Sequence, residues 1–245
     1  MADALRPDGE AEDDAAERPR TLDEELLDAP LEHATDPMRI SRMRRELELG
    51  FDALADVEHG VSIFGSARTH PNDPDYLQAV ETARRLGAAG YAVITGGGSG
   101  IMAAANQGAR EAGALSIGLA IDLPFLEPEN PWIDRPLRFH YFFTRKVMFV
   151  RYASAFVVFP GGFGTLDELF EALTLIQTRK IRGFPVVLVG RDYWEPLIGW
   201  LRERVLGEGK ISAPDLDLLA VVESVEEIVA IVTEATERRS ARRSG

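Results

Sequence analysis

Short apolar runs alternate with helical patterns along most of the chain, from Gly60 onward. The apolar runs that predict strands are Val61–Gly65, Tyr91–Thr95, Leu115–Ile121, Leu137–Phe143, Ala155–Phe159, Pro185–Val189 and Leu218–Val222. Apolar spacings of three and four predict helices over Tyr76–Ala89, Ile101–Ala112, Thr144–Tyr152, Thr165–Thr178, Tyr193–Leu206 and Val225–Thr236. Continuously apolar strands between amphipathic helices are typical of a parallel sheet that is buried on both faces. The pattern therefore predicts an α/β fold with a mainly parallel sheet of about seven strands.

The flanking segments have other patterns. From Pro37 to about Val57, helical spacing predicts a helix that lies against the rest of the chain or against another subunit. Its apolar positions are Met38, Ile40, Met43, Leu47, Phe51 and Leu54. The three prolines of Asp122–Arg135 predict a long loop. We thus predict a leader over residues 1–36, a helical extension over 37–59, the α/β domain over 60–237 and a basic tail over 238–245.

Charge is unevenly distributed along the 245 residues. The formal net charge is −13, of which the leader carries −10 and residues 37–245 carry only −3. The leader is rich in Ala, Asp, Glu and Pro and has no aromatic residue, so we expect it to be disordered. The acidic surplus argues against broad electrostatic binding to nucleic acid or to anionic membranes. For the arginines of the tail we favour a solvated chain end over a binding role.

Several classes of chemistry are excluded by composition. The chain contains no cysteine, which rules out disulfide scaffolds, thiolate zinc sites and cysteine nucleophiles. No signal-peptide pattern and no membrane-length apolar run occurs, so we expect a cytoplasmic protein. The four histidines lack the spacing of a metal site, and nothing marks any of the three lysines as a Schiff base for pyridoxal phosphate. We therefore expect neither a histidine metal site nor a pyridoxal phosphate enzyme.

Glycine clusters follow two of the predicted strands. Residues 95–102 (TGGGSGIM) follow one strand, residues 160–168 (PGGFGTLDE) follow another, and Gly65-Ser66 is a weaker candidate after the first. At the carboxyl ends of strands, glycines let the backbone approach a phosphate and helix N-termini supply N–H donors. Two such loops favour a phosphate-bearing ligand over the alternative of tight turns alone. Neither loop fits the dinucleotide fingerprint, the NTPase P-loop or the hydrolase nucleophile elbow.

Charged residues lie beside these loops. Arg145 and Lys146 follow Thr144, a candidate N-cap, where cations oppose the helix dipole unless a ligand or an acid neutralises them. Glu168 ends a T-x-x-E sequence that begins at Thr165 and fits a capping box. The alternative is a carboxylate beside a bound sugar phosphate, where it stabilises an oxocarbenium-like transition state or activates water. The sequence leaves these alternatives open.

The same residues resemble a known family. PGGFGTLDE resembles the PGGxGTxxE signature of the LOG family, the cytokinin riboside 5′-monophosphate phosphoribohydrolases. Ser62–Arg68 (SIFGSAR), Gly96–Met102 (GGGSGIM) and the Arg145-Lys146 pair agree in order, so the resemblance covers roughly residues 60–190. It implies a Rossmann-like three-layer fold in which residues 60–237 form a nucleotide-binding catalytic domain. It also implies cofactor-free hydrolysis of the N-glycosidic bond of a nucleoside 5′-monophosphate, with an N6-substituted adenine such as isopentenyladenine, or AMP, as substrate.

The resemblance implies roles for individual residues. The catalytic arginine and glutamate of the family match Arg145 and Glu168. The residues that we expect to bind substrate phosphate are Gly65, Ser66, Gly97, Gly98, Ser99, Lys146, Gly161, Gly162, Gly164 and Thr165. Many members carry the label lysine decarboxylase, and the absence of a marked cofactor lysine argues against that activity. One departure lies at residues 142–146, which read Phe-Phe-Thr-Arg-Lys where short members have Met-His-Glu-Arg-Lys.

The resemblance also concerns partners. The acidic leader and the helix over 37–57 are additions to the short form, and they resemble the longer bacterial branch. The family implies self-association as a homodimer or hexamer, with the helices after Thr144 and Thr165 at the subunit interface. We expect a small nucleoside monophosphate as the other partner, and no nucleic acid or membrane. The alternative is a non-catalytic carrier of the same fold that binds a nucleotide or molybdenum cofactor; the presence of both Arg145 and Glu168 favours the enzyme.

Overall fold

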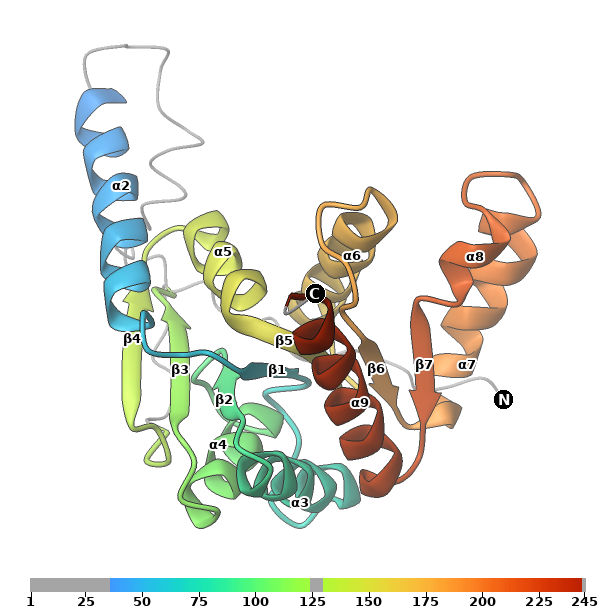
Figure 1. Ribbon diagram of the computed structural model, residues 1–245, viewed down its shortest axis with the longest axis horizontal. Helices are drawn as coiled ribbons and strands as arrows, with labels where there is room; N and C mark the ends of the chain where they lie inside the picture. The colour runs from blue at the N-terminus through green and yellow to red at the C-terminus, as the bar shows by residue number, and fades with distance from the viewer. Residues whose placement is uncertain (1–35, 124–129, 244–245) are drawn as a thin grey trace, which may run out of the picture.

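The computed structural model describes residues 36–123 and 130–243, and it contains a seven-stranded parallel sheet. The strand order is β4-β3-β2-β1-β5-β6-β7 (Figure 1). The strands are β1 (Gly60–Phe64), β2 (Ala92–Thr95), β3 (Ser116–Ile121), β4 (Arg135–Phe139), β5 (Ala153–Val158), β6 (Val186–Val189) and β7 (Leu219–Val222). The helices are α2 (Asp36–Ala53), α3 (Pro74–Ala88), α4 (Ile101–Glu111), α5 (Phe142–Tyr152), α6 (Phe163–Gln177), α7 (Arg191–Trp200), α8 (Ala213–Leu216) and α9 (Val225–Arg243). The predicted fold class is confirmed; apart from Asp36, the predicted leader lies outside the described residues.

Helices cover both faces of the sheet, as Figure 1 shows. On one face, α3, α4 and α9 pack on apolar side chains of the central strands. On the other face, α5, α6 and α7 build a second apolar cluster with the opposite side chains of the same strands. Every residue of β1 and β5 is buried, because each strand lies inside the sheet and between two helical layers. This explains why their sequences are mostly apolar and do not alternate with polar residues; the exceptions are the buried Ser62 and Ser154.

The position of β1 determines where a ligand can bind. β1 pairs with β2 on one side and with β5 on the other. From β1 the chain adds β2, β3 and β4 in one direction, and it then returns to add β5, β6 and β7 in the other. Such a reversal leaves a crevice at the carboxyl ends of the two strands that flank it, which is where open α/β sheets bind ligands. In this protein those strands are β1 and β5.

The strand predicted over Leu137–Phe143 is wrong in its bounds. β4 is Arg135–Phe139, and α5 already begins at Phe142. An apolar and aromatic run crosses the junction between the two elements, and periodicity cannot separate a short strand from a helix start in such a run. The true edge strand alternates half-buried and exposed residues up to a buried Phe139. α5 thus starts two residues before the predicted Thr144.

Other predicted bounds differ at the ends of the domain. The helix predicted over Tyr193–Leu206 begins at Arg191, and its last part, Leu201–Leu206, is π-helical. α9 continues past the predicted end at Thr236 and reaches Arg243. Of the predicted loop before β4, residues 124–129 lie outside the described residues. Within the part of the chain that the structure describes, no helix is long and apolar enough to cross a membrane.

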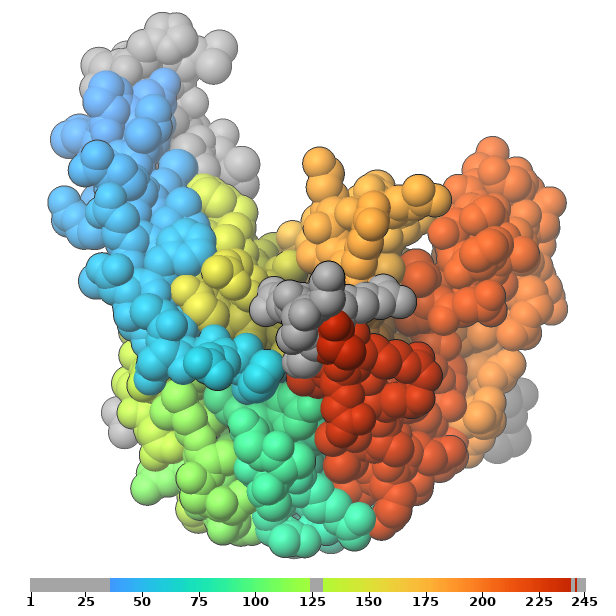
Figure 2. Space-filling model, in the orientation of Figure 1, coloured from blue at the N-terminus to red at the C-terminus, as the bar shows by residue number. Residues whose placement is uncertain are grey.

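α2 lies beside α5 and the β4 edge of the sheet (Figures 1 and 2). The hydroxyl of Tyr152 donates a 3.2 Å hydrogen bond to the carbonyl oxygen of Phe51, and Arg135 donates to the carbonyl oxygen of Ala53. Only the second half of the predicted apolar face is in contact, since Met38 and Ile40 near the start of α2 are exposed. The helix is therefore attached to the domain through its C-terminal half.

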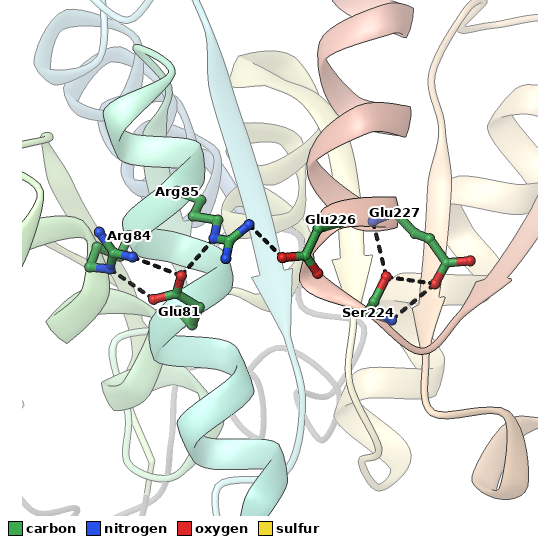
Figure 3. Close-up of polar contacts among 6 residues, drawn as sticks. All are labelled: Glu81, Arg84, Arg85, Ser224, Glu226 and Glu227. Carbon is green, nitrogen blue, oxygen red and sulfur yellow. Dashed lines mark hydrogen bonds and ion pairs between the residues drawn. The ribbon is translucent and has the colours of Figure 1, made fainter.

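An ion pair joins α3 to α9 (Figure 3). Glu81 accepts hydrogen bonds from two arginines of its own helix, which lower the pKa of its carboxyl to about 2. One of them, Arg85, also contacts Glu226 at 2.7 Å in the first turn of α9. Ser224 and Glu227 form a reciprocal cap at the start of α9. Because the ion pairs are solvent-exposed, their net stabilisation is small.

Candidate functional site

A cavity of about 800 Å³ opens where β1 and β5 end. Its wall includes residues 64–69 at the end of β1 and beyond it, residues 160–165 after β5 and in the first turn of α6, and Gly96 after β2. Arg145 and Glu168 also line it. The structure thus brings together one complete glycine cluster, the weaker Gly65-Ser66 candidate and the two charged residues of the sequence analysis. The loop after β2 contributes less than expected, because β1 lies between β2 and β5.

Close backbone contacts hold the loop after β1 in place. The backbone N–H of Ser66 donates to the carbonyl oxygen of Pro160 at 2.9 Å, and the N–H of Ile101 donates to the carbonyl oxygen of Ser66 at 3.0 Å. A Cβ atom on Gly65 would lie 2.7 Å from the Ile101 side chain. Gly100 has φ +61°, and a Cβ there would lie 2.2 Å from the Ser66 carbonyl oxygen. These glycines allow the ends of β1 and β5 and the start of α4 to meet beside the cavity.

The loop after β5 leads into the first turn of α6. Gly162 is the N-cap of this helix, and no side chain caps it. A Cβ atom on Gly161 would lie 2.2 Å from the hydroxyl oxygen of Thr165, so only glycine fits there without movement. The first turn of a helix has N–H groups without intrahelical acceptors and the positive end of the dipole. Gly161, Gly162, Gly164 and Thr165 therefore form a wall suited to an anion.

The loop after β2 has a different role in the structure. Among the described residues, Gly96 lines the cavity but Gly97, Gly98 and Ser99 do not. Gly97 has φ +77° and packs on β3, the carbonyl oxygen of Gly98 accepts from Asn130, and the Ser99 hydroxyl donates to the carbonyl oxygen of Ala67. Gly97, Gly98 and Ser99 thus form a turn that packs against neighbouring segments. The geometry gives no support to their predicted role in phosphate binding.

Glu168 is a buried carboxylate in the wall of the cavity. The residue is 3% exposed, and no described group donates a hydrogen bond to its Oε2 atom. Burial raises the pKa of Glu168 to about 7, although the positive charges of Lys146 and Arg145 act in the opposite direction. Of the two alternatives that the sequence left open, the capping box is wrong, because α6 begins at Phe163 and both Thr165 and Glu168 lie inside the helix. The carboxylate therefore does not serve the helix terminus.

Arg145 reaches the cavity from the first turn of α5. Its guanidinium carbon lies 5.0 Å from the ring centre of Phe142 and 5.6 Å from that of Phe149. Its Nη1 atom would be 4.0 Å from a Cβ built on Gly96, which places the cation toward the loop after β2. The predicted N-cap at Thr144 is wrong, since Tyr141 occupies that position. Arg145 is thus a cation in a helix first turn that faces the same cavity as Glu168.

Lys146 is not among the described residues that line the cavity. Its ammonium pairs with Asp167 at 2.9 Å and with Glu171 at 3.0 Å, both on α6. Burial alone would lower the pKa of Lys146, and hydrogen bonds from its ammonium to the two carboxylates outweigh this effect and raise it. Lys146 therefore links α5 to α6, and the geometry gives no support to its predicted contact with phosphate.

Three polar residues of the wall were missed by the sequence analysis as site residues. Arg68 and Thr69 follow the Gly65-Ser66 turn, so the SIFGSAR block contained a signal for them. Tyr193 at the start of α7 donates a 2.7 Å hydrogen bond to the carbonyl oxygen of Gly161. Nothing in the local sequence indicates this contact, because it joins residues 32 positions apart.

The cavity has an apolar side as well. It is formed by Phe64, Met102, Ile121, Leu123, Phe142 and Phe149. The arrangement suits a ligand with an anionic group at the α6 terminus and a flat or apolar group on the aromatic side. No group of three metal-binding side chains occurs among the residues that the structure describes.

Comparisons with known proteins give a consistent picture. The sequence model of a family described as "Possible lysine decarboxylase" matches residues 102–232, more than half of the chain. Cytokinin riboside 5′-monophosphate phosphoribohydrolase of Mycobacterium tuberculosis is 32% identical over 165 residues, which are 63% of this chain and 85% of that protein. Probable cytokinin riboside 5′-monophosphate phosphoribohydrolase LOGL3 of Oryza sativa is 31% identical over 156 residues, 62% of this chain and 72% of that protein.

A solved structure agrees with the fold. The molybdenum cofactor carrier protein of Chlamydomonas reinhardtii superimposes with a TM-score of 0.54, over 74% of this chain and 99% of that protein. Its sequence is 22% identical, so this likeness concerns the fold alone.

Proposed function

The chain belongs to the LOG family, whose sequence model carries the description possible lysine decarboxylase, and from this premise we propose that it hydrolyses nucleoside 5′-monophosphates. The reaction breaks the N-glycosidic bond and releases free base and ribose 5-phosphate. The observation that carries this proposal is the buried carboxylate of Glu168, which shares a cavity with Arg145 and with the first turn of α6.

The substrate phosphate fits the loop between β5 and α6. Backbone N–H groups of this first turn and the positive end of the helix dipole favour an anion there. The chain has a strong negative net charge, so attraction of the phosphate depends on these local groups and on Arg145. The ribose then lies between the phosphate site and the apolar side, next to Glu168.

Glu168 acts on the anomeric carbon in this proposal. The electron pair of the bond between C1′ and the base nitrogen leaves with the base, and the oxygen of a water molecule bonds to C1′. Ionised Glu168 stabilises the positive charge on the ribose and takes a proton from that water, while the departing base gains a proton. A pKa of about 7 suits this role, because the carboxylate can both hold and release a proton near neutral pH.

Arg145 supports this chemistry by its charge. Its guanidinium favours the ionised form of Glu168 and is one of the causes that oppose the rise in the pKa of that carboxyl. In the complex it would contact the phosphate and hold the carboxylate in its orientation.

The finer choice of base follows from the apolar side of the cavity. Aromatic and aliphatic side chains there would accommodate an N6-substituted adenine such as isopentenyladenine, and AMP is the second substrate that we propose. The test is a panel of nucleoside monophosphates scored by release of ribose 5-phosphate. Tight binding of AMP without release of base would contradict hydrolysis and favour a carrier.

Lysine decarboxylation has less support from the geometry. Among the described residues that line the cavity, none is a lysine that could form a Schiff base with pyridoxal phosphate. Lys146, the nearest lysine in sequence to the site, is engaged by two carboxylates of α6. The description of the family model as a possible lysine decarboxylase therefore does not determine the activity that we propose for this chain.

We also propose that the chain associates with copies of itself through α5 and α6. Large apolar side chains of these helices are exposed beside the cavity: Phe142, Phe143, Val147, Phe163 and Phe170. Phe163 is 92% exposed in the first turn of α6, next to the proposed phosphate site. Exposed apolar groups concentrated on neighbouring helices are typical of a protein interface.

A further inference from the structure

Glu46 of α2 is a buried carboxylate outside the cavity. It is 6% exposed. Its Oε1 atom accepts a hydrogen bond from the backbone N–H of His140 at 3.2 Å and lies 2.7 Å from Nδ1 of the same residue. Its Oε2 atom lies 2.7 Å from the hydroxyl oxygen of Thr144 and 3.5 Å from the backbone nitrogen of Tyr141. All of these partners lie within five consecutive residues, far from Glu46 in the sequence.

The partners of Glu46 surround the start of α5. Tyr141 is the N-cap of this helix and provides no side-chain cap. Glu46 accepts hydrogen bonds from the backbone N–H of Tyr141 and from that of His140 just before it, and its Oε2 atom contacts the hydroxyl of Thr144 in the first turn. A carboxylate that bonds to the N–H of the N-cap residue does what the N3 side chain does in a capping box, and negative charge is favoured at this end of the helix dipole. Glu46 therefore supplies from α2 a cap that the local sequence of α5 lacks.

The contacts of Glu46 with the start of α5 do more than attach α2 to the domain. Apolar and backbone contacts already join the two helices, since the side chain of Met148 packs on Gly50 and Tyr152 bonds to the backbone of Phe51. Burial of a carboxylate costs stability unless hydrogen bonds compensate for it. If residue 46 served only to pack α2 against the domain, an apolar side chain would stabilise the protein more. The direction of the Glu46 oxygens toward the α5 terminus points to a role there.

Arg145 is the residue that this cap affects most directly. It follows Thr144 in the chain, in the same helical turn that Glu46 holds. Its other neighbour, Lys146, is fixed to α6 by two ion pairs. The backbone on both sides of Arg145 is thus held by side-chain contacts from different helices.

We propose that Glu46 is a positioning residue, which fixes the first turn of α5 and thereby the place of Arg145 in the cavity. The inference rests on the proposed function, in which Arg145 contacts the substrate. The hydroxyl of Thr144, in the first turn of α5, contacts this carboxylate of α2 directly, one residue before Arg145.

The test is a double-mutant cycle between Glu46 and Arg145. Release of base from AMP is measured for the full-length protein and for Glu46→Ala, Arg145→Ala and the double variant, with kcat and KM determined separately. Glu48→Gln is the matched control, because Glu48 is exposed on the same helix and forms an ion pair with the solvent-exposed Arg44. Glu46→Gln keeps one carbonyl acceptor and serves as the conservative variant.

We expect Glu46→Ala to lower kcat/KM by about 10- to 100-fold, the effect of a displacement near 1 Å at a catalytic group. Glu46→Gln keeps part of the kcat/KM that Glu46→Ala loses, and Glu48→Gln has the kcat/KM of the wild type. In the Arg145→Ala background the Glu46 substitution costs no further activity, because its effect passes through Arg145. A purely structural role would lower the activity of both backgrounds by the same factor.

Two results would overturn the inference: activity of Glu46→Ala within twofold of the wild type, or equal losses in both backgrounds. If Glu46→Ala fails to fold, Glu46→Gln replaces it in the double-mutant cycle, and the same two results would overturn the inference. If the wild type releases no base, the proposed function fails, and the cycle is then measured as affinity for AMP by calorimetry. Additive losses of affinity would overturn the inference on that measurement as well.

Discussion

The hydroxyl of Tyr193 donates a 2.7 Å hydrogen bond to the carbonyl oxygen of Gly161. This contact joins α7 to the loop between β5 and α6, which forms the proposed phosphate site. Gly161 itself is held against the side chain of Thr165. The loop is thus held from two sides, by Tyr193 of α7 and by Thr165 in the first turn of α6.

Tyr193→Phe tests whether this contact holds the phosphate site. One hydrogen bond contributes about 0.5–1.5 kcal/mol, so we expect KM for a nucleoside monophosphate to rise by about 2- to 10-fold with little change in kcat. Steady-state kinetics measure both values. Tyr76→Phe is the control, because its hydroxyl bonds to Gln107 on α4, away from the cavity. Equal kinetics for Tyr193→Phe and the wild type would show that the contact is dispensable.

Gly161→Ala tests the packing of the same loop. The added Cβ would lie 2.2 Å from the hydroxyl oxygen and 2.7 Å from Cβ of Thr165, so the loop or the first turn of α6 must move. We predict that affinity for ribose 5-phosphate, measured by calorimetry, falls by at least about 10-fold, which corresponds to 1.4 kcal/mol. Gly199→Ala, which meets no atom within 4 Å, should bind as the wild type does. Unchanged affinity of Gly161→Ala would contradict a close backbone approach at this position.

Burial of Glu168 predicts a dependence of stability on pH. Its pKa is about 7 in the folded protein and close to 4.5 in the unfolded chain, so the folded state binds the proton more tightly. Stability from this group is therefore full below pH 4.5, falls as the pH rises toward 7 and stays low above it. The cost of the ionised form is roughly 3 kcal/mol, at about 1.4 kcal/mol per pKa unit.

Glu168→Gln removes this cost, because the amide stays neutral. We predict that the variant is more stable than the wild type at pH 8 and that the difference shrinks toward pH 4.5, in denaturant unfolding curves at both pH values. Glu48→Gln, at an exposed site on α2, should show no such trend. A difference that does not vary with pH would mean that the pKa of Glu168 is close to its usual value.

The fold was predictable because its signals are local. Strands such as β1 and β5 are mostly apolar, since helical layers cover both of their faces, and the helices between the strands have a regular apolar spacing. The positions of Arg145 and Glu168 on one cavity followed from the glycine loops at the strand ends and from the resemblance to the LOG family. These features needed no knowledge of contacts between distant residues.

The errors share a physical cause, which is that caps and loops depend on distant partners. Thr144 and Thr165 have the residue type of an N-cap, but the helices begin two residues earlier, at Phe142 and Phe163. The cap of α5 comes from Glu46, nearly a hundred positions away. Lys146 carries the charge for a phosphate contact, yet carboxylates of α6 engage it. No local pattern contains this information.

Self-association can be tested at Phe163. This side chain is almost fully exposed beside other apolar residues of α5 and α6. We predict that Phe163→Asp shifts the mass in light scattering toward the monomer at a concentration where the wild type is a dimer or larger. Leu77→Asp on α3 is the control, because Leu77 is a large exposed apolar residue on the other face of the sheet. A wild-type mass equal to that of one chain would contradict the proposed interface.

The central claim is that Glu168 drives hydrolysis of the N-glycosidic bond, and release of ribose 5-phosphate tests it most directly. Wild type, Glu168→Gln and Glu48→Gln are incubated with AMP and with isopentenyladenosine monophosphate, and both products are quantified by chromatography. Glu48 is an exposed glutamate of α2 that pairs with Arg44, so it is the matched control. We predict equal amounts of free base and ribose 5-phosphate from the wild type and from Glu48→Gln, and a loss of about 10²- to 10⁴-fold in Glu168→Gln. Near-normal turnover by Glu168→Gln, or no product from the wild type, would contradict the account.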